Sequence, residues 1–540
     1  MSAPTTAGWT TVARTTRKRA RLAGGVLAAV TVLVAGCGGG GTAAPAEPAR
    51  SVGTAPTGPA DPTATLRFSF GTDASKNYDP ATAANQFVNT FLLPAYDRLF
   101  DIDAKGTVSP MLAESSAVSD GGKTLTLTLR QGVVFHDGTP FDAAAVKANI
   151  ERGKTAERSA LKPDLAAVVG VDVIDPRTVA LRLSAPTASL PALLADRAGM
   201  MVSPAAFTKP DLDLMPVGAG PYRVVSDQPG AQVVYEKFDR YWNPELTKNA
   251  VQRIVLSVQL NPETRLRSVA AREVDATSIN PDQYAAAAGS GGQVLVNPST
   301  GAFLVYLNMA KNPALAKPAV REALSMAIDR VGIAAAILGG QCTANPQIFP
   351  AGYWAADTQL PPARFDPAAA KQKLADAGFP NGFPMTMTVV NIAPYSTVAE
   401  AVANQFGQIG VPVQLQVAEP AQVISSFTGQ KSVDSYVSQW PGAVDPARTV
   451  ASLYLPGGTF NPGGLVDDRI AQLAAQGLAA TSGPDREKVY QQISARAVEQ
   501  HLQLPICSTS SLLMATGSVR SVQSTIAGAV DLRAVEIAKG

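Results

Sequence analysis

The chain has 540 residues, which is too many for one hydrophobic core, so two or more lobes are expected. Hydrophobic residues make up 46% and charged residues 16% of it, a balance that is ordinary for a globular protein and excludes wholesale disorder. The formal net charge is +2, yet the first 36 positions hold five basic residues and no acid, leaving 40 basic against 43 acidic residues elsewhere. A nucleic-acid-binding surface in the body of the protein is therefore not expected.

The N-terminus has the pattern of a secretory signal peptide, residues 1–36. A basic region ends at Arg21, and an apolar run of 15 residues follows from Leu22 to Gly36, too short to cross a bilayer comfortably. The stretch "VLVAGC" then matches the bacterial lipobox, which predicts a lipid on Cys37; the alternative is an unlipidated signal peptide. Residues 37–62 are rich in Gly, Pro, Ala and Thr, so a flexible tether is expected between the anchor and the folded part.

Two antiparallel units are predicted in the first half of the folded part. "KTLTLTLR" (123–130) alternates with period 2, as a half-buried strand does, and "VDVIDPRTVALRL" (171–183) reads as a hairpin around Asp175–Pro176–Arg177. Between them lies "FHDGTPF", where a strand is expected to end at a Gly138 turn and a helix to start near Asp142. The C-terminal half alternates helices and strands, which favours an α/β fold.

Helices and strands of that half are predicted from periodicity and end signals. The helix within 318–330 buries a face of five residues that ends at Ile328, and the helix after Asp366 ends at Gly378. A further helix is expected over 484–502, and a strand–helix–strand unit over 385–391, 398–409 and 411–417. Besides Cys37, only Cys342 and Cys507 remain, and in an oxidising compartment they are expected to form a disulfide, with two free buried thiols as the alternative.

No motif for catalysis or metal binding stands out. His136 and His501 are the only histidines, without metal-ligand spacing, and a P-loop, a G-x-S-x-G elbow and a G-x-G-x-x-G that follows a strand are all absent. Ser159 and Lys162 match the S-x-x-K of penicillin-recognising hydrolases, but no companion motif follows. His136 and Asp137 are adjacent on an extended segment and point to opposite faces, so a structural corner is predicted there rather than a catalytic pair.

Several segments resemble one family in its own order along the chain. "MLAESSAVSDGGKTLTLTLRQGVVFHDGTPFDAAAVKANIER" (111–152) is similar to the signature segment of the family 5 extracellular solute-binding proteins of ABC importers. Further matches cover most of residues 65–540: "YDP", "YDRLF", "PVGAGPYRV", "FDRYWNP", "REVDA", "VREALSMAIDR" and "FDPAAAKQKLADAGFPNGF".

The resemblance implies a two-lobed α/β fold that closes on a ligand, with the hinge crossed twice. Lobe I would comprise 63–299, with the signature subdomain at about 108–215, and a C-terminal return at 508–540; lobe II would comprise 300–507. It further implies a monomeric, lipid-anchored, extracytoplasmic receptor that hands peptides or peptide-like solutes to ABC permease subunits. Neither catalysis on the ligand nor a cofactor or metal is expected.

One segment departs from the peptide-binding members of the family. Their amine-anchoring aspartate stands three residues after a Trp, but "SQWPGAVDPA" (438–447) has Ala443 at that distance from Trp440 and is one residue short before Asp445–Pro446. Asp445 either replaces the missing anchor or only caps the next helix. The predicted ligand-binding residues are Phe303, Tyr353, Trp354, Tyr436, Gln439, Trp440, Asp445 and Tyr454, each with core or surface packing as its alternative.

The sequence is also compatible with other functions. The same receptor could bind a nickel chelate, haem, a sugar or an opine-like compound. An envelope serine hydrolase built on Ser159 and Lys162 belongs to a different class, as does a sensor or assembly factor on the same fold.

Overall fold

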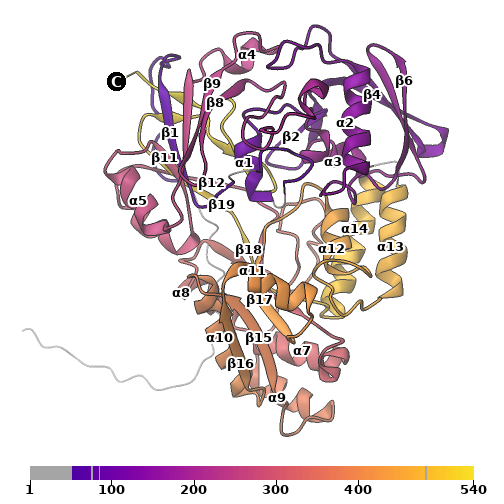
Figure 1. Ribbon diagram of the computed structural model, residues 1–540. Coiled ribbons are helices and arrows are strands. Elements are labelled where there is room, and N and C mark those ends of the chain that lie inside the picture. The colour runs from indigo at the N-terminus through magenta and orange to yellow at the C-terminus, as the bar shows by residue number, and fades with distance from the viewer. Residues whose placement is uncertain (1–50, 75–76, 84–85, 481–482, 540) are drawn as a thin grey trace, which may run out of the picture. The chain divides into compact units, whose positions relative to one another are not determined.

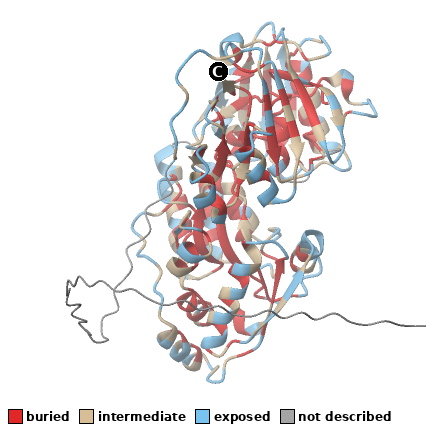
Figure 2. Cartoon of the chain, turned by 90° about the vertical axis from the view of Figure 1, so that its left-hand side faces the viewer, coloured by how far each residue is buried: buried red, intermediate tan, exposed pale blue. Residues whose placement is uncertain are grey.

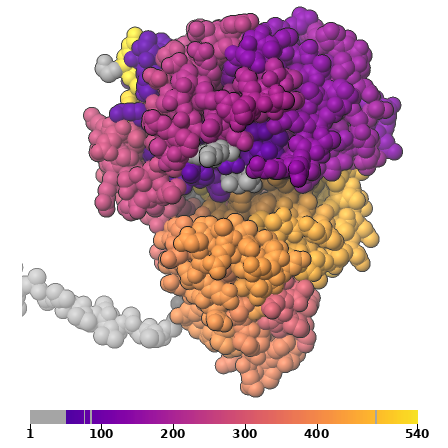
Figure 3. Space-filling model, viewed as in Figure 1, coloured from indigo at the N-terminus to yellow at the C-terminus, as the bar shows by residue number. Residues whose placement is uncertain are grey.

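The computed structural model describes residues 51–74, 77–83, 86–480 and 483–539, and these form two lobes (Figure 1). The two sheets of lobe I are built from the N-terminal half and the C-terminal segment, and the sheet of lobe II is built from the stretch between them. Buried strands form the interior of each lobe, while exposed residues gather on loops and outer helix faces (Figure 2). On the face in Figure 3, the surface is hollowed where indigo and magenta residues of lobe I meet orange residues of lobe II.

The main sheet of lobe I has seven strands. Its central strand β1 runs parallel to β10 and β11, and the other pairs in the sheet are antiparallel. The order across the sheet is β12 (Gln293–Asn297), β19 (Ser511–Ala515), β11 (Ala276–Ile279), β1 (Thr65–Phe70), β10 (Arg253–Val258), β9 (Gln232–Lys237) and β8 (Tyr222–Gln228).

The second sheet of lobe I spans residues 113–183 and contains the strand and the hairpin predicted from the sequence. The order is β4 (Ala113–Ser119), β5 (Thr124–Leu129), β7 (Thr178–Leu183) and β6 (Val168–Asp175). In β5 the leucines are buried and the threonines partly exposed, as strict alternation predicts. Helix α2 (Ala143–Thr155) starts where expected, because the Asp142 carboxylate accepts a hydrogen bond from the Ala145 N–H.

Lobe II is a six-stranded mixed sheet with helices around it. The strand order is β14 (Cys342–Ala344), β18 (Leu504–Thr509), β13 (Ala302–Leu307), β17 (Ser435–Trp440), β15 (Met385–Val390) and β16 (Val413–Ala418). Its helices are α7 (Pro318–Ala327), α8 (Arg330–Ala336), α9 (Pro367–Asp376), α10 (Tyr395–Gln408), α11 (Pro420–Ile424), α12 (Pro446–Leu453), α13 (Asp468–Ala479) and α14 (Gly483–Glu499). The predicted strand–helix–strand unit is β15–α10–β16, and the predicted C-terminal helix is α14.

One helix boundary predicted from periodicity is wrong. The buried face of the 318–330 segment includes Ile328, yet α7 ends at Ala327 and Ile328 has an extended backbone. The Asp329 side chain accepts a hydrogen bond from the Gly332 N–H and thereby starts a second helix, α8. The capping hydrogen bond of Asp329 therefore sets the helix boundary, although the apolar period continues to Ile328.

Short elements complete the fold. The short helices of lobe I are α1 (Asn89–Leu92), α3 (Leu190–Leu193), α4 (Pro244–Thr247), α5 (Pro262–Ala270) and α6 (Tyr284–Ala288). The short strands form three pairs: β2 (Phe100–Ile102) with β3 (Val108–Pro110), β20 (Val519–Arg520) with β23 (Glu536–Ile537), and β21 (Gln523–Ser524) with β22 (Val530–Asp531). No helix within the described residues combines the length and the apolar character needed to cross a membrane.

The chain passes between the lobes at two adjacent places. It leaves lobe I between β12 and β13 and returns between β18 and β19. The crossings are hydrogen-bonded to each other, because the Thr509 N–H donates to the Gly301 carbonyl over 2.9 Å. Close to the second crossing, a disulfide joins Cys342 of β14 to Cys507 of β18.

Three of the motifs that carry the family resemblance meet one another inside lobe I. Asp97, of "YDRLF", accepts hydrogen bonds from the Tyr241 hydroxyl and the Trp242 indole of "FDRYWNP" at 3.0 and 2.6 Å. Gly218, of "PVGAGPYRV", packs so tightly that a Cβ there would lie 2.1 Å from the Ala95 carbonyl oxygen. These motifs therefore build the core of lobe I.

Candidate ligand-binding site

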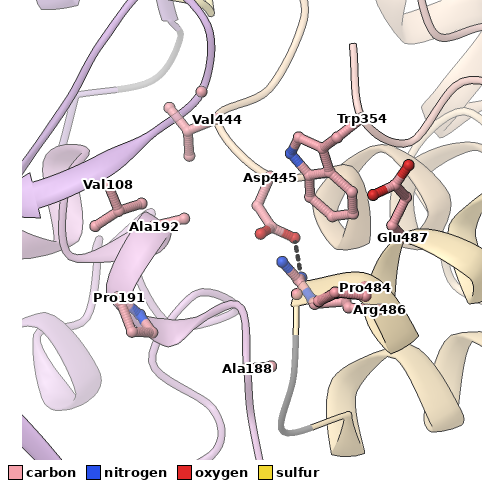
Figure 4. A pocket seen from close by; sticks show the side chains of 12 residues that line it. Val108, Ala188, Pro191, Ala192, Trp354, Val444, Asp445, Pro484, Arg486 and Glu487 are labelled. Atoms are coloured by element: carbon pink, nitrogen blue, oxygen red, sulfur yellow. Dashed lines mark hydrogen bonds and ion pairs between the residues drawn. The ribbon is translucent and has the colours of Figure 1, made fainter.

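A cavity of about 500 Å³ lies between the lobes in the described part of the chain (Figure 4). Its volume falls in the range of small-molecule sites, roughly 300–1,000 Å³. Lobe I contributes only small or apolar residues, namely Gly106, Val108, Ala188, Pro191 and Ala192. Lobe II contributes Trp354, Val444, Asp445, Gly483, Pro484, Arg486 and Glu487, so every charged side chain of the lining comes from lobe II.

Asp445 is the buried acid of this cavity. It precedes α12, where its Oδ1 accepts a hydrogen bond from the Ala447 N–H, and only 2% of the residue is exposed. The same Oδ1 accepts a second hydrogen bond, from Arg486 Nη2 at 2.7 Å. Asp445 therefore caps the helix and pairs with an arginine of its own lobe.

The second carboxylate oxygen of Asp445 is left for another partner. Within the described part of the chain no hydrogen bond to Oδ2 is found, and Figure 4 shows this oxygen turned away from Arg486, toward the lobe I wall. A buried carboxylate oxygen that faces a cavity is suited to accept a hydrogen bond from a ligand cation.

Aromatic rings hold Arg486 in place. Its guanidinium carbon lies 5.1 Å from the Trp354 ring centroid and 5.2 Å from that of Tyr490, and Nε donates to the Gly477 carbonyl. Burial acts to lower the pKa of the Arg486 guanidinium, but the charge and hydrogen bond of Asp445, together with Tyr490, outweigh burial and raise this pKa. With Glu487 included, the cavity has two carboxylates against one guanidinium, which favours a cationic group on the ligand.

Of the residues predicted from the sequence, Trp354 and Asp445 line this cavity. Tyr353 lies beside it, stacked obliquely on Trp354, and burial, followed by the Asp445 charge, raises the pKa of its phenol well above the usual value. Phe303 and Gln439 lie on adjacent strands: Phe303 packs on Tyr395, and Gln439 bonds to Tyr395 and Thr509. They form a separate group beside the interlobe crossings.

The remaining predicted residues are buried inside lobe II. Tyr436 stacks on Tyr306, Trp440 meets Phe460 edge-on at 5.8 Å, and 5% of Tyr454 is exposed. Ala443, at the position of the family's amine anchor, is also buried, and both its N–H and its carbonyl bond to the Thr300 hydroxyl. The anchor position itself therefore offers a ligand no carboxylate.

Arg486 and Glu487 were not predicted from the sequence. One local signal was available, since Arg486 lies in the first turn of α14, where the helix dipole disfavours a positive charge. A cation at that position points to a nearby acid, but the acid is 41 residues away along the chain.

The residues considered for catalysis do not form a catalytic arrangement. The Ser159 hydroxyl donates to the Gly153 carbonyl and Lys162 Nζ to the Glu157 carbonyl. His136 Nε2 donates to the Gly220 carbonyl, while its Nδ1 accepts from the Gly218 N–H, so the imidazole is held by backbone. Among the described residues, no group of three or more His, Cys, Asp or Glu side chains is placed to hold a metal ion.

Known proteins with similar sequences and folds are solute-binding proteins. The sequence model for "Bacterial extracellular solute-binding proteins, family 5 Middle" matches residues 107–462. The glutathione-binding protein GsiB of Salmonella paratyphi A is 31% identical over 365 residues, which cover 66% of this chain and 70% of that protein. GsiB of Shigella dysenteriae is 28% identical over 427 residues, covering 76% of this chain and 83% of the relative.

Solved structures show the same two-lobed fold. NikA from Brucella suis, in complex with Fe(III)-EDTA, superposes with a TM-score of 0.78 at 25% identity, over 88% of this chain and 100% of that one. The periplasmic binding protein DppA from Helicobacter pylori, in complex with the peptide STSA, also gives 0.78, at 21% identity over 88% and 98% of the chains. These relatives are binding proteins, and the predicted two-lobed α/β fold is confirmed. The chain belongs to the bacterial extracellular solute-binding proteins of family 5, and its role is extracytoplasmic substrate binding for an ABC importer.

Proposed function

We propose that the protein is a monomeric, lipid-anchored receptor that binds peptides or peptide-like solutes in the cavity between its lobes. The observation that carries this proposal is Asp445 Oδ2, a buried carboxylate oxygen that faces the cavity without a hydrogen bond from the described residues. A ligand ammonium group there would meet an excess of negative charge and the ring of Trp354. The GsiB relatives are named for binding glutathione, a peptide-like solute, which agrees with such a ligand.

Amine recognition by Asp445 can be tested with two libraries of tripeptides, one with free amino termini and the same one after N-acetylation. Mass spectrometry would identify the peptides that co-elute with the purified protein. We expect retention of the free library and little of the acetylated one. Asp445→Asn keeps the helix cap but removes the charge, so it should weaken retention about 10- to 100-fold, the value of a hydrogen bond to a charged group.

Arg486→Gln is the matched control for this experiment, because it acts in the opposite direction. It removes the cation that competes for Asp445, so binding of free amines should become tighter. Equal retention of free and acetylated peptides, or an unchanged affinity in Asp445→Asn, would rule out amine recognition at this cavity. Thermal melting of both variants would show whether the fold is retained.

A non-peptide solute is the second candidate, and the placement of Ala443 favours it. Ala443, at the amine-anchor position, has no carboxylate, and the Asp445 carboxylate is already in an ion pair with Arg486. Structures of the same fold have been solved with Fe(III)-EDTA and with agropinic acid. If this candidate holds, neither library is retained, and mass spectrometry of the freshly purified protein finds a co-purified compound without a free amine.

Lipid attachment is proposed at Cys37, which lies outside the described residues. Cleavage before Cys37 would leave this residue at the N-terminus, followed by the proposed tether. The tether would be shorter than the 37–62 expected from composition, because Val52 is hydrogen-bonded to Val294 and Asp61 to Ile537 of lobe I. In a bacterial host with lipoprotein processing, the wild type should incorporate labelled palmitate and sediment with membranes. Cys37→Ser should lose the label and appear in the soluble extracytoplasmic fraction, and membrane retention of this variant would contradict the proposal.

A further inference from the structure

An ion pair connects the two lobes next to the cavity. Arg448 of α12, in lobe II, places its Nη1 at 2.8 and 2.7 Å from the two carboxylate oxygens of Asp164, in the lobe I segment between α2 and β6. The two residues are 284 positions apart in the sequence. One guanidinium nitrogen lies within hydrogen-bond distance of both carboxylate oxygens. This double contact fixes the arginine more closely than the single contact of many surface ion pairs does.

The environment of Asp164 makes this pair more important than a surface contact. Only 9% of the Asp164 side chain is exposed, against 29% for Arg448. Burial raises the pKa of the Asp164 carboxyl, the charges of Arg448 and Arg197 act against this increase, and Asp196 adds to it. A buried carboxylate near a second acid is costly without its cation, so Asp164 depends on an arginine from the other lobe.

Asp445, the buried acid of the cavity, lies at the same end of α12 as Arg448. Asp445 precedes α12 and accepts the Arg448 N–H on its backbone carbonyl, while its side chain faces the cavity and pairs with Arg486 of α14. The first turn of α12 is thus held by α14 on one side and by lobe I on the other. A second interlobe hydrogen bond, from the Ala188 N–H to the Leu478 carbonyl, lies at the same cavity wall.

We propose that Asp164 and Arg448 are positioning residues that hold the lobes together and fix the first turn of α12, and with it Asp445, against the ligand. When the lobes separate, Arg448 leaves Asp164, and α12 loses its support from lobe I. The pair therefore sets the balance between open and closed protein and the geometry of the cavity at the same time. This role holds for whichever solute the cavity binds.

The test is a distance measurement between the lobes in the protein without added ligand. Spin labels on Ile174→Cys in lobe I and Val417→Cys in lobe II, both of them exposed, report lobe separation by pulsed electron paramagnetic resonance in a secreted Cys37→Ser protein. Arg448→Gln removes the cation that is hydrogen-bonded to the buried Asp164 and should raise the ratio of open to closed protein about tenfold or more. Asp164→Asn should shift it in the same direction by less, because neutral Asn tolerates burial better.

A double variant and control variants distinguish a role of the Asp164–Arg448 ion pair from a general loss of structure. The double variant Asp164→Asn/Arg448→Gln should open no further than Arg448→Gln alone, and Arg448→Lys should restore part of the closed population. Glu322→Gln breaks an ion pair with Lys373 inside lobe II and should leave the distances unchanged. Wild-type distances in both single variants, or strictly additive effects in the double variant, would overturn the proposal.

Discussion

Replacing Cys342 and Cys507 together by serine is expected to lower the free energy of unfolding by about 3–5 kcal/mol, the largest effect of any change considered. The bond spans 165 positions of sequence, and closing so long a loop removes much conformational entropy from the unfolded chain. It ties the edge strand β14 to β18, the strand that leads back to lobe I. Urea denaturation followed by fluorescence would measure the change.

Reduction provides an independent check of the same bond. Because 3% of Cys342 and none of Cys507 is exposed, a reductant should act only after local opening, and the reduced wild type should then match the double serine variant. Cys37→Ser is the matched control and should have the midpoint of the wild type. An unchanged midpoint in the double variant would mean that the bond does not contribute to stability.

Acidification from pH 6.5 to pH 4 is expected to remove up to about 3 kcal/mol of stability through His136 alone. Burial lowers the pKa of this imidazole from 6.5 to about 4, although its backbone partners act in the opposite direction. The folded state therefore binds the proton less readily than the unfolded chain does. The stabilisation is complete above pH 6.5 and is lost as the pH falls toward 4.

The titration can be measured directly because the chain has only two histidines. Nuclear magnetic resonance of the imidazole protons should give midpoints near 4 for both, since burial also lowers the pKa of His501 to about 4. His136→Gln should flatten the dependence of stability on pH across this window. A His136 midpoint near 6.5 would contradict the assignment.

Protonation of Asp97 has the opposite effect on stability, so its contribution must be separated from that of the histidines. Burial raises the pKa of its carboxyl from 3.8 to about 6, despite Arg533, Trp242 and Tyr241. Protonation of Asp97 therefore stabilises the folded state as the pH falls through this range. Comparing wild type with His136→Gln at each pH cancels the contribution of Asp97, which both proteins share.

Local patterns predicted several elements of the fold. Strict alternation gave β5, capping aspartates marked the starts of α2 and α9, and the "FHDG" corner has Gly138 at a φ of +83°. Such signals are readable because they reflect burial of one face or the bonding of one helix end, both of which depend on residues close in sequence. The helix predicted through Ile328 failed because two local signals, periodicity and a cap, disagreed there.

The sequence by itself determined the family, the α/β class, and those strands and helices that carry a strict period or an end signal. Only the tertiary structure decided which side chains meet at the cavity: it placed Trp354 and Asp445 there, left Tyr436, Trp440 and Tyr454 inside lobe II, and added Arg486. The pairs Asp445–Arg486 and Asp164–Arg448 join positions 41 and 284 residues apart. No local period encodes such pairs, because the two partners meet only after distant segments have folded together, within lobe II for the first pair and across the lobes for the second.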